Sequence, residues 1–404
     1  MSILPDDFIR ETRLVMGEER FNSFLGAFNE DAPTSIRLNP IVPLSPCEVQ
    51  QVPWCKEGYY LQGRPQFTFD PLFHAGCYYV QEASSMFICH ILRQYVKEPV
   101  AMLDLCAAPG GKSTAARAVL PEGSTLVSNE PITTRAHILL ENITKWGWPD
   151  CIVTNNYPRD FRKAKARFDV ILCDVPCSGE GMFRKDPNAI SEWSLQNVEK
   201  CWRLQREIVA DAWECLNPGG ILIYSTCTYN TKENEENVRW ILDNYDAEML
   251  EIPTEPSWGI TGSLLQGFDA PVYRFIPGFT KGEGLFMAVL QHKGTVPRAS
   301  KERQRLNYTG TVPSVLRRLT SDLPQGDFPR VDLSYQEALK YLRGEALILS
   351  PDTPRGIVTI TYQGFPLGPM KNLGNRANNL YPKAWRIKTT HLPSEAPKVL
   401  LNDE

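Results

Sequence analysis

The sequence lacks any long apolar run: none approaches the roughly 18 consecutive apolar residues that a membrane-spanning helix requires. Its first residues, MSILPDDFIRE, also lack the basic-then-apolar pattern of a secretory leader. These two absences argue against a membrane protein and against an exported one. We therefore expect a cytoplasmic protein that does not associate with a membrane.

The 11 cysteines include no C-x-x-C pair, and none of them lies beyond Cys227. This spacing gives no indication of a zinc knuckle or of a thioredoxin-type redox site, so we expect no metal centre. In the cytoplasm the thiols should be reduced. Five of them lie within apolar patterns and are expected to be buried in the core: Cys89, Cys151, Cys173, Cys201 and Cys215.

Charge of one sign is not in large excess, since the net charge of the chain is −4 at pH 7. Such a value does not by itself suggest nucleic-acid binding. The basic residues are unevenly placed, however, because about 16 Lys and Arg against about 7 Asp and Glu lie between Lys293 and Lys388. This bias favours an acidic partner such as RNA, although a solvated basic surface would have the same composition.

A chain of 404 residues exceeds a single comfortable core, so we expect two or three domains. Residues 1–75 begin with two amphipathic helices and are predicted to form a small α/β appendage. Residues 76–292 alternate strands with helices, which is typical of a Rossmann-like, doubly wound α/β sheet. Residues 293–345 are expected to be a linker with short helices, one of them at Val315–Leu319, and residues 346–404 a small β-rich module.

Six strands of the sheet are expected from their apolar runs: Ala101–Leu105, Thr125–Asn129, Cys151–Thr154, Asp169–Cys173, Gly220–Ser225 and Gly284–Gln291. Asp174 and Cys177 follow the fourth of these strands, and Cys227 follows the fifth. Because ligands bind at the carboxyl ends of parallel strands, we expect these three side chains to form a site. The alternative for each cysteine alone is a buried core thiol, at roughly even odds.

A loop of small residues follows the first strand: Cys106, Ala107, Ala108, Pro109, Gly110, Gly111 and Lys112. Its glycines allow backbone N–H groups at a helix N-terminus to approach a ligand closely. It is not a Walker A phosphate loop, because that motif needs a glycine where Cys106 stands. Glu130 ends the second strand, where doubly wound folds place a carboxylate that accepts hydrogen bonds from ribose hydroxyls. A surface acid is the alternative for Glu130.

Three segments carry a strong family resemblance: DLCAAPGGKST, DVPCSGEGMFRKDP and YSTCTYNTKENE. Together they resemble the Sun/Fmu-type RNA cytosine-5 methyltransferases, and within these the RsmF-type bacterial ribosomal RNA enzymes. PTSIRLNP, YYVQEASSM and GEGLFMAVL also resemble family segments, so the resemblance covers about residues 30–292. The segment GFPLGPMKNLGNRANNLYPKAWRI resembles the PUA-like RNA-binding module of the RsmF group.

The resemblance implies a sheet that binds S-adenosylmethionine. Cys106–Lys112 would surround the methionine and ribose side of the cofactor, Glu130 would hold the ribose hydroxyls, and Asp174 would lie near both cofactor and base. Two positions depart from the family pattern: Val175 replaces the usual alanine, and no aspartate ends the third strand. We assign the adenine contact to Asn155, which follows that strand and whose amide could read an adenine edge.

A reaction at carbon 5 of cytosine explains the use of two thiols. A thiolate that adds to carbon 6 makes carbon 5 nucleophilic, and an acid such as Asp174 can assist at the ring nitrogen N3. The resemblance assigns Cys227 as the nucleophile and Cys177 as the residue that aids release. The residues alone do not decide this, because the Pro-Cys motif of DNA cytosine methyltransferases would suggest the reverse. Lys112 could lower a thiol pKa, or it could cap a loop or bind the cofactor carboxylate.

The resemblance implies small-subunit ribosomal RNA, free or in its assembly particle, as the substrate. Nothing in the sequence suggests an obligate oligomer, so we expect a monomer. The alternatives are the same reaction on transfer RNA, and a non-catalytic RNA-binding assembly factor. The intact Cys177, Cys227 and Asp174 count against the latter. Arg184 and Lys185 lie beside the predicted catalytic loop and could hold RNA phosphates, or they could form a solvated surface.

Overall fold

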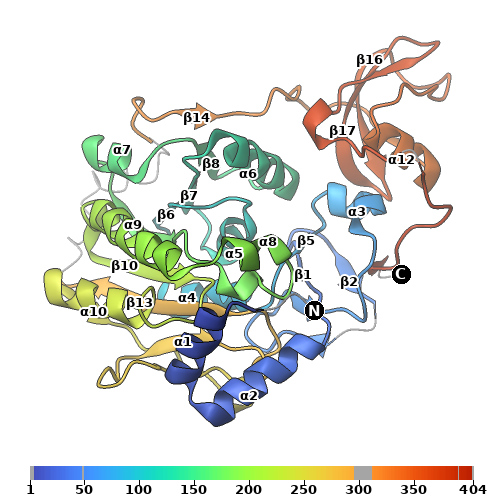
Figure 1. Cartoon of the computed structure of the whole chain (residues 1–404). Coiled ribbons are helices and arrows are strands. Elements are labelled where there is room, and N and C mark those ends of the chain that lie inside the picture. The colour runs from blue at the N-terminus through green and yellow to red at the C-terminus, as the bar shows by residue number, and fades with distance from the viewer. Residues whose placement is uncertain (1–3, 48–49, 295–311, 390, 403–404) are drawn as a thin grey trace.

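The computed structural model describes residues 4–47, 50–294, 312–389 and 391–402. A large sheet with helices on both faces forms the centre of the molecule (Figure 1). The N-terminal helices α1 (Asp6–Met16) and α2 (Glu18–Gly26) lie at one end of it, and a C-terminal β-module lies at the opposite end. Within the described residues, no helix is long and apolar enough to cross a membrane.

The central sheet, as far as the chain is described, has nine strands in the order β11-β13-β10-β9-β6-β7-β8-β14, with β12 paired to β13. Their bounds are β6 Ala101–Asp104, β7 Thr125–Asn129, β8 Cys151–Thr154, β9 Phe168–Asp174, β10 Leu216–Thr226, β11 Ala247–Met249, β12 Val272–Phe275, β13 Leu285–His292 and β14 Arg318–Leu319. The strands β10, β9, β6, β7 and β8 run parallel, and β13 is antiparallel to β10. The chain runs outward from β6 to β8 and resumes at β9 on the other side of β6. The carboxyl ends of β6 and β9 therefore flank the topological switch point, which confirms the predicted doubly wound sheet.

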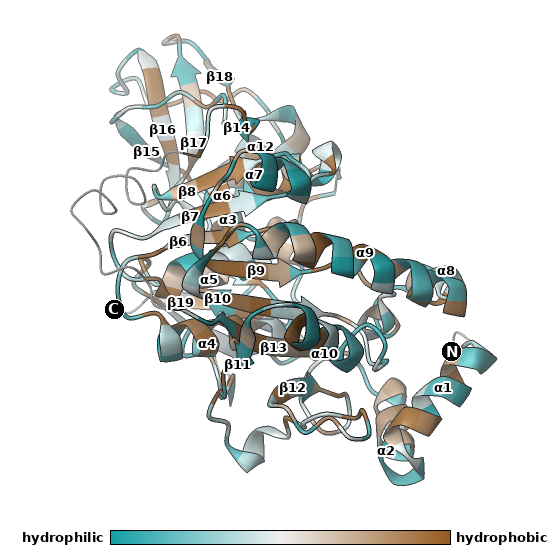
Figure 2. Cartoon of the chain, turned by 90° about the vertical axis from the view of Figure 1, so that its left-hand side faces the viewer, coloured by the Kyte–Doolittle hydropathy of each residue, from teal (hydrophilic) through white to brown (hydrophobic). Residues whose placement is uncertain are grey.

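Two hydrophobic cores cover opposite faces of this sheet. The helices that enclose them are α4 Phe87–Tyr95, α5 Gly111–Val119, α7 Pro158–Lys163, α9 Leu195–Trp213 and α10 Glu235–Asn244. The helix α6 (Thr133–Trp146) packs in a smaller cluster with Ala107, Ala108 and Val153. Along β6, Leu103 faces the core beneath α9 and α10, and Met102 faces the core beneath α4 and α5. A strand buried on both faces has an almost continuous apolar sequence, and Figure 2 shows β9 and β10 as largely hydrophobic strands between the helices.

Two local predictions in this sheet differ from the structure. The helix expected at Val315–Leu319 is wrong, because Arg318–Leu319 form β14, antiparallel to β8. The edge of β8 offers backbone groups that need partners, and pairing with them outweighs the local helical pattern. β10 begins at Leu216 rather than at Gly220, and its pairing with β9 shifts register before Ile221. In both cases the pairing between strands, and not the local sequence pattern, decides the secondary structure.

The cysteines away from the two strand ends are free thiols in varied surroundings. Cys89, Cys173, Cys201 and Cys215 are buried, as predicted. Cys151 is only partly buried, because it begins β8 near the edge of the sheet, where fewer elements cover the strand.

The N-terminal region combines the two helices with a small sheet of order β3-β4-β1-β5. The bounds are β1 Ser35–Leu38, β3 Gln50–Gln51, β4 Gly58–Tyr60 and β5 Tyr78–Val80. Gly17 separates α1 from α2 with a φ of +74°, a backbone conformation that favours glycine. Because β5 pairs with β1, this sheet extends beyond the predicted boundary at residue 75.

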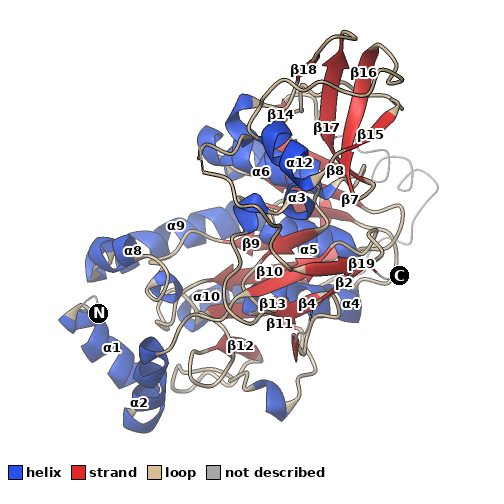
Figure 3. Cartoon of the chain, turned by 90° about the vertical axis from the view of Figure 1, so that its right-hand side faces the viewer, coloured by secondary structure: helices blue, strands red, loops and turns tan. Residues whose placement is uncertain are grey.

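The C-terminal module is a sheet of order β15-β16-β17-β18 with one helix. The bounds are β15 Arg330–Asp332, α12 Tyr335–Leu342, β16 Gly356–Tyr362, β17 Phe365–Asn372 and β18 Ala377–Asn379. Because β15 pairs with β16, the sheet begins at Arg330, upstream of the predicted start at residue 346. Its core includes Ile36 and Tyr78 of the N-terminal region beside Tyr341 and Ile360. Figure 3 shows this sheet standing beyond the β8 end of the central one.

The C-terminal end of the chain returns to the N-terminal region. β19 (Leu400–Asn402) pairs antiparallel with β2 (Leu44–Pro46).

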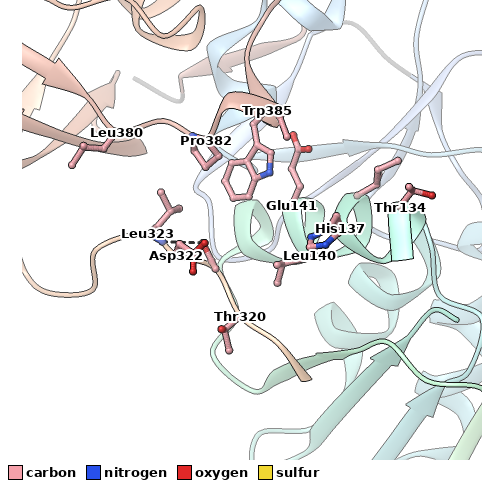
Figure 4. A pocket seen from close by; sticks show the side chains of 13 residues that line it. Thr134, His137, Leu140, Glu141, Thr320, Asp322, Leu323, Leu380, Pro382 and Trp385 are labelled. Carbon is pink, nitrogen blue, oxygen red and sulfur yellow. Dashed lines mark hydrogen bonds between the residues drawn. The ribbon is translucent and has the colours of Figure 1, made fainter. Parts of the chain in front are cut away.

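A cavity of about 560 Å³ lies between the C-terminal module and α6. His137 and Glu141 line it from α6, and Trp385 lines it from the module (Figure 4). Its lining includes none of the predicted catalytic residues.

A buried ion pair ties β12 to α10. Arg274 Nε donates to Glu235 Oε1 at 2.7 Å, and Arg274 Nη1 donates to the carbonyl oxygen of Tyr229 at 2.7 Å. The side chains of Arg274 and Glu235 are 1 % and 0 % exposed. The pair therefore anchors the segment that follows Cys227.

We expect Arg274→Ala to lower the free energy of unfolding by about 3–5 kcal/mol, because the substitution leaves the Glu235 carboxylate buried without its partner. Chemical denaturation measures this change. Lys293→Ala is the control, since the side chains of the Lys293–Asp246 pair are 51 % and 69 % exposed and exposed pairs contribute little. Equal, small changes in the two variants would contradict the prediction.

Candidate active site

The two strand-end cysteines meet at the carboxyl edge of the sheet. Cys177 follows β9 and Cys227 follows β10, and the two strands are adjacent and parallel. Their Sγ atoms are 3.1 Å apart, and the backbone N–H of Cys227 points to Cys177 Sγ at 3.3 Å. Both residues retain partial exposure. The structure thus brings together the thiols that the sequence analysis singled out.

The surroundings of Cys177 favour its neutral thiol. The hydrogen bond to Cys227 raises the pKa of Cys177, and burial and the nearby negative charge of Glu233 raise it further. Since Cys177 holds its proton, its S–H can donate to the sulfur of Cys227. Either sulfur can act as the donor in this contact, and the raised pKa of Cys177 favours the arrangement in which its S–H points to Cys227.

Asp174 and Lys112 form an ion pair beside the thiols. Lys112 Nζ lies 2.8 Å from Asp174 Oδ2, and the two side chains are 14 % and 29 % exposed. Burial lowers the pKa of Lys112, but attraction to Asp174 and, more weakly, to Cys227 outweighs burial, so the net shift is upward. Lys112 therefore stays charged in the resting state. The ion pair connects the first turn of α5, which carries Lys112, to the end of β9, which carries Asp174.

The loop Cys106–Lys112 connects β6 to α5 at the switch point. Gly110 has a φ of +115°, and a Cβ there would come within 3.2 Å of the Leu139 side chain, so the position favours glycine. Arg135 Nη2 donates to the carbonyl oxygen of Ala108 at 2.9 Å. Burial raises the pKa of Cys106, which therefore serves as a neutral core thiol in the wall of the loop.

Two buried acids end the neighbouring strands. Glu130 follows β7 and is 1 % exposed; its Oε1 accepts the backbone N–H of Ile132 at 3.0 Å. Asp104 ends β6, and its Oδ2 accepts the Ser113 hydroxyl at 2.6 Å. Burial raises the pKa of Asp104 to about 7, and its Oδ1 has no hydrogen-bond partner among the described residues. The sequence analysis did not select Asp104, although an acid in a buried strand was a usable signal.

Asn155 supports the loop that carries Glu130. Its Nδ2 donates to the carbonyl oxygens of Glu130 and Pro131 at 2.8 and 3.0 Å, and its Oδ1 accepts the Thr133 hydroxyl at 3.1 Å. Both amide hydrogens are therefore used inside the protein. The side-chain carbonyl oxygen of Asn155 can still accept a further hydrogen bond, so a direct contact with adenine would have to use that atom.

A further buried carboxylate, Glu180, joins the loop that follows β9 and carries Cys177 to the loop that follows β10 and carries Cys227. Its Oε2 accepts the backbone N–H groups of Tyr229 and Asn230 at 2.6 and 3.0 Å. Its Oε1 accepts the Trp193 indole N–H at 3.0 Å. Sequence reasoning missed Glu180, because its partners lie in other segments and its local pattern is that of an ordinary loop acid.

Arg184 does not lie where an RNA phosphate contact would require it. Its side chain is 7 % exposed, and Nη1 lies 3.2 Å from Glu283 Oε1. Nη2 donates to the carbonyl oxygens of Glu30 and Asp31 at 3.0 and 3.2 Å. Arg184 therefore joins the loop after Cys177 to the N-terminal region, whereas Lys185 beside it is exposed.

The sheet and its strand-end site define the class of the protein, a Rossmann-like methyltransferase. A methyltransferase homologue from Pyrococcus horikoshii is 25 % identical with a TM-score of 0.58, over 72 % of this chain and 100 % of that one. NSun6 from Pyrococcus horikoshii, solved with SFG, has a TM-score of 0.60 at 20 % identity, over 73 % of this chain and 100 % of that one. The second likeness concerns the fold alone.

The chain belongs to the RsmF group of the 16S rRNA methyltransferase RsmB/F family. The model of that family matches residues 92–291, that of the RsmF N-terminal domain matches 4–83, and that of the RsmF PUA domain matches 328–387. Ribosomal RNA small subunit methyltransferase F of Cronobacter sakazakii is 30 % identical over 92 % of this chain and 81 % of its own length. The Serratia proteamaculans protein of that name is 32 % identical over 75 % of this chain, which spans 66 % of it, just under two thirds. The predicted family resemblance is confirmed.

We expect Arg184→Ala to lower the free energy of unfolding by about 3–5 kcal/mol, because Glu283 is left buried without its partner. The salt dependence of RNA binding should stay unchanged. Lys185→Ala should do the opposite: stability is kept, and the slope of log K against log salt decreases by about 1 if Lys185 contacts a phosphate. Chemical denaturation and RNA titrations over a salt series measure both quantities. A stable Arg184→Ala protein with a reduced slope would restore the phosphate role.

Proposed function

We propose that this protein transfers a methyl group from S-adenosylmethionine to carbon 5 of a cytosine in small-subunit ribosomal RNA. The observation that carries the proposal is the pair of sulfur atoms 3.1 Å apart at the ends of β9 and β10, beside the Lys112–Asp174 pair. Methylation at an exocyclic nitrogen or a ribose hydroxyl needs no such pair of thiols. The family's description as 16S rRNA methyltransferases supports ribosomal RNA over transfer RNA.

The residues at the switch point fit the proposed cofactor. Glu130 offers carboxylate oxygens to ribose hydroxyls, as doubly wound folds commonly do. The unpartnered Oδ1 of Asp104 and the carboxylate of Asp174 suit the positive charges of an ammonium and a sulfonium group. A structural neighbour solved with SFG, an analogue of S-adenosylmethionine, agrees with this assignment. When bound, the cofactor supplies an electrophilic methyl group.

The reaction would begin with addition of the Cys227 thiolate to carbon 6 of a cytosine that has been taken out of its stack. The electrons of the C5–C6 double bond then become available at carbon 5. A proton from Lys112 can reach N3 through Asp174, because Nζ donates to Oδ2 at 2.8 Å. Protonation there stabilises the charge that addition places on the ring.

Release would reverse the addition after the methyl group has been accepted. The C5–H bond breaks and its electron pair restores the C5–C6 double bond, while the electrons of the C6–S bond return to Cys227. Cys177 gives its proton to the departing sulfur and takes the carbon 5 proton in exchange. The proton on N3 returns through Asp174 to Lys112, which restores the ion pair. The raised pKa of Cys177 supports a neutral thiol that can give this proton, and the family resemblance assigns Cys227 as the nucleophile.

The C-terminal module would contribute to RNA binding. It matches the RsmF PUA domain, and its basic residues Lys371, Arg376, Lys383, Arg386 and Lys388 suit a phosphate backbone. We further infer a cytoplasmic enzyme that acts as a monomer on the RNA or on its assembly particle.

Cys227→Ala should abolish methyl transfer, because no thiolate can add to the ring. Cys177→Ala should form the adduct but release it slowly, so that a protein–RNA species stable to denaturant accumulates. Incubation with S-adenosylmethionine and small-subunit ribosomal RNA, followed by a denaturing gel and base analysis, measures both outcomes. Cys151→Ala, at the amino end of β8, is the control and should behave as wild type.

An adduct with Cys227→Ala alone would reverse the two roles. Absence of both adduct and 5-methylcytosine in every variant, with free RNA and with particles, would reject the proposed reaction. The same assay on transfer RNA tests the alternative substrate.

A further inference from the structure

A buried carboxylate, Glu233, lies where the two cysteine loops meet. It is 0 % exposed. Its Oε2 accepts the backbone N–H of Ser178 at 3.0 Å and the amide of Gln205 at 2.7 Å. Its Oε1 accepts the Ser178 hydroxyl at 2.5 Å and the amide of Asn230 at 2.8 Å. Four donors from three segments thus converge on one side chain.

Each of these donors lies close to one of the two cysteines in the chain or is hydrogen-bonded to a residue that adjoins one. Ser178 follows Cys177 in the chain, and Gln205 Nε2 also donates to the carbonyl oxygen of Pro176, the residue before Cys177, at 2.9 Å. Both neighbours of Cys177 are therefore tied to Glu233. Asn230 lies three residues after Cys227, so the same carboxylate also reaches the second loop.

A carboxylate is the side chain that this position requires. Burial raises the pKa of Glu233 to about 7, while the hydrogen bonds from Ser178, Asn230 and Gln205 favour its ionised form. In that form the acid accepts at both oxygens and offers no donor, whereas a glutamine must turn an NH₂ group toward one side. At the Oε2 side, that NH₂ would oppose the Ser178 N–H and the Gln205 amide. At the Oε1 side it could donate to the Ser178 hydroxyl but would oppose the Asn230 amide. Glutamine therefore loses at least one link between the loops.

We propose that Glu233 is a positioning residue for release: through Ser178, Gln205 and Asn230 it holds the Cys177 thiol against the Cys227 sulfur. This inference rests on the proposed function. Addition of Cys227 to the base needs only one sulfur, whereas the exchange of protons in release needs both sulfurs at hydrogen-bond distance. Loss of Glu233 should therefore slow release far more than addition.

The experiment compares wild type, Glu233→Gln and Cys177→Ala with S-adenosylmethionine and ribosomal RNA. Glu233→Gln should form the RNA adduct at a rate close to that of wild type and then accumulate it. Its kcat should fall at least about tenfold, the size expected when a catalytic group is misplaced, with the KM for RNA unchanged. Glu207→Gln, an exposed acid on the same helix as Gln205, is the matched control and should retain wild-type turnover.

Two results would overturn the inference: wild-type turnover of Glu233→Gln, or loss of addition and release in equal proportion, which is the mark of a general structural role. If Glu233→Gln shows no cooperative thermal transition, Ser178→Ala decides, because it removes the hydroxyl and keeps the backbone N–H. It should accumulate a smaller amount of adduct, and a Ser178→Ala enzyme without adduct would count against the inference. If Cys177→Ala accumulates the adduct and Glu233→Gln does not, the inference is rejected while the proposed function stands. Absence of adduct and of methylation in all proteins rejects the proposed function and the inference with it.

Discussion

The parallel pairing of β9 with β10 is the constraint on which the site depends. Asp174 lies opposite Ser225 in this register, so the chain leaves both strands at the same level. The Gly181 N–H then donates to the carbonyl oxygen of Cys227 at 2.8 Å, which keeps the two loops together. A one-residue slip would turn every side chain of one strand to the opposite face. The pairing of the two strands in the sheet therefore sets the distance between the sulfur atoms.

Buried charges and hydrogen bonds, more than apolar packing, define the shape of the loops around the thiols. Glu180, Glu233 and Glu235 are buried, and each accepts hydrogen bonds from more than one segment. Apolar contacts tolerate small shifts, whereas a buried polar group without its partner costs about 1–3 kcal/mol. A fully satisfied polar network therefore specifies one arrangement. The proposed passage of a proton between the two sulfur atoms would depend on such a fixed arrangement.

The N-terminal region packs against the two loops that carry Cys177 and Cys227 and links them to the rest of the molecule. Phe8 packs on Phe183 and Phe24 packs on Tyr229, with ring centroids 4.9 and 5.0 Å apart. The same region shares a hydrophobic core with the C-terminal module. The three parts of the chain are therefore coupled by packing: residues early in the sequence contact both the site and the module that matches a PUA domain.

The sequence by itself determined the sheet and the place of the two thiols in it. Short runs of apolar and β-branched residues bounded by turn residues mark strands, so Thr125–Asn129 and Cys151–Thr154 were predicted to the residue. Proline and glycine stop the strand before Cys177, which places that thiol at the ligand-binding edge. Periodicity and turn residues are local signals, and local signals suffice for these features.

Only the tertiary structure decided the pairing of β14, the burial of Arg184 and the convergence on Glu233. The backbone partners of Arg184 lie 154 and 153 residues away, and Glu233 meets Ser178 across 55 residues. A charged residue in a polar segment has the same local pattern whether it faces solvent or is buried. What makes burial possible is compensation by donors from distant segments, and that compensation exists only once the chain has folded.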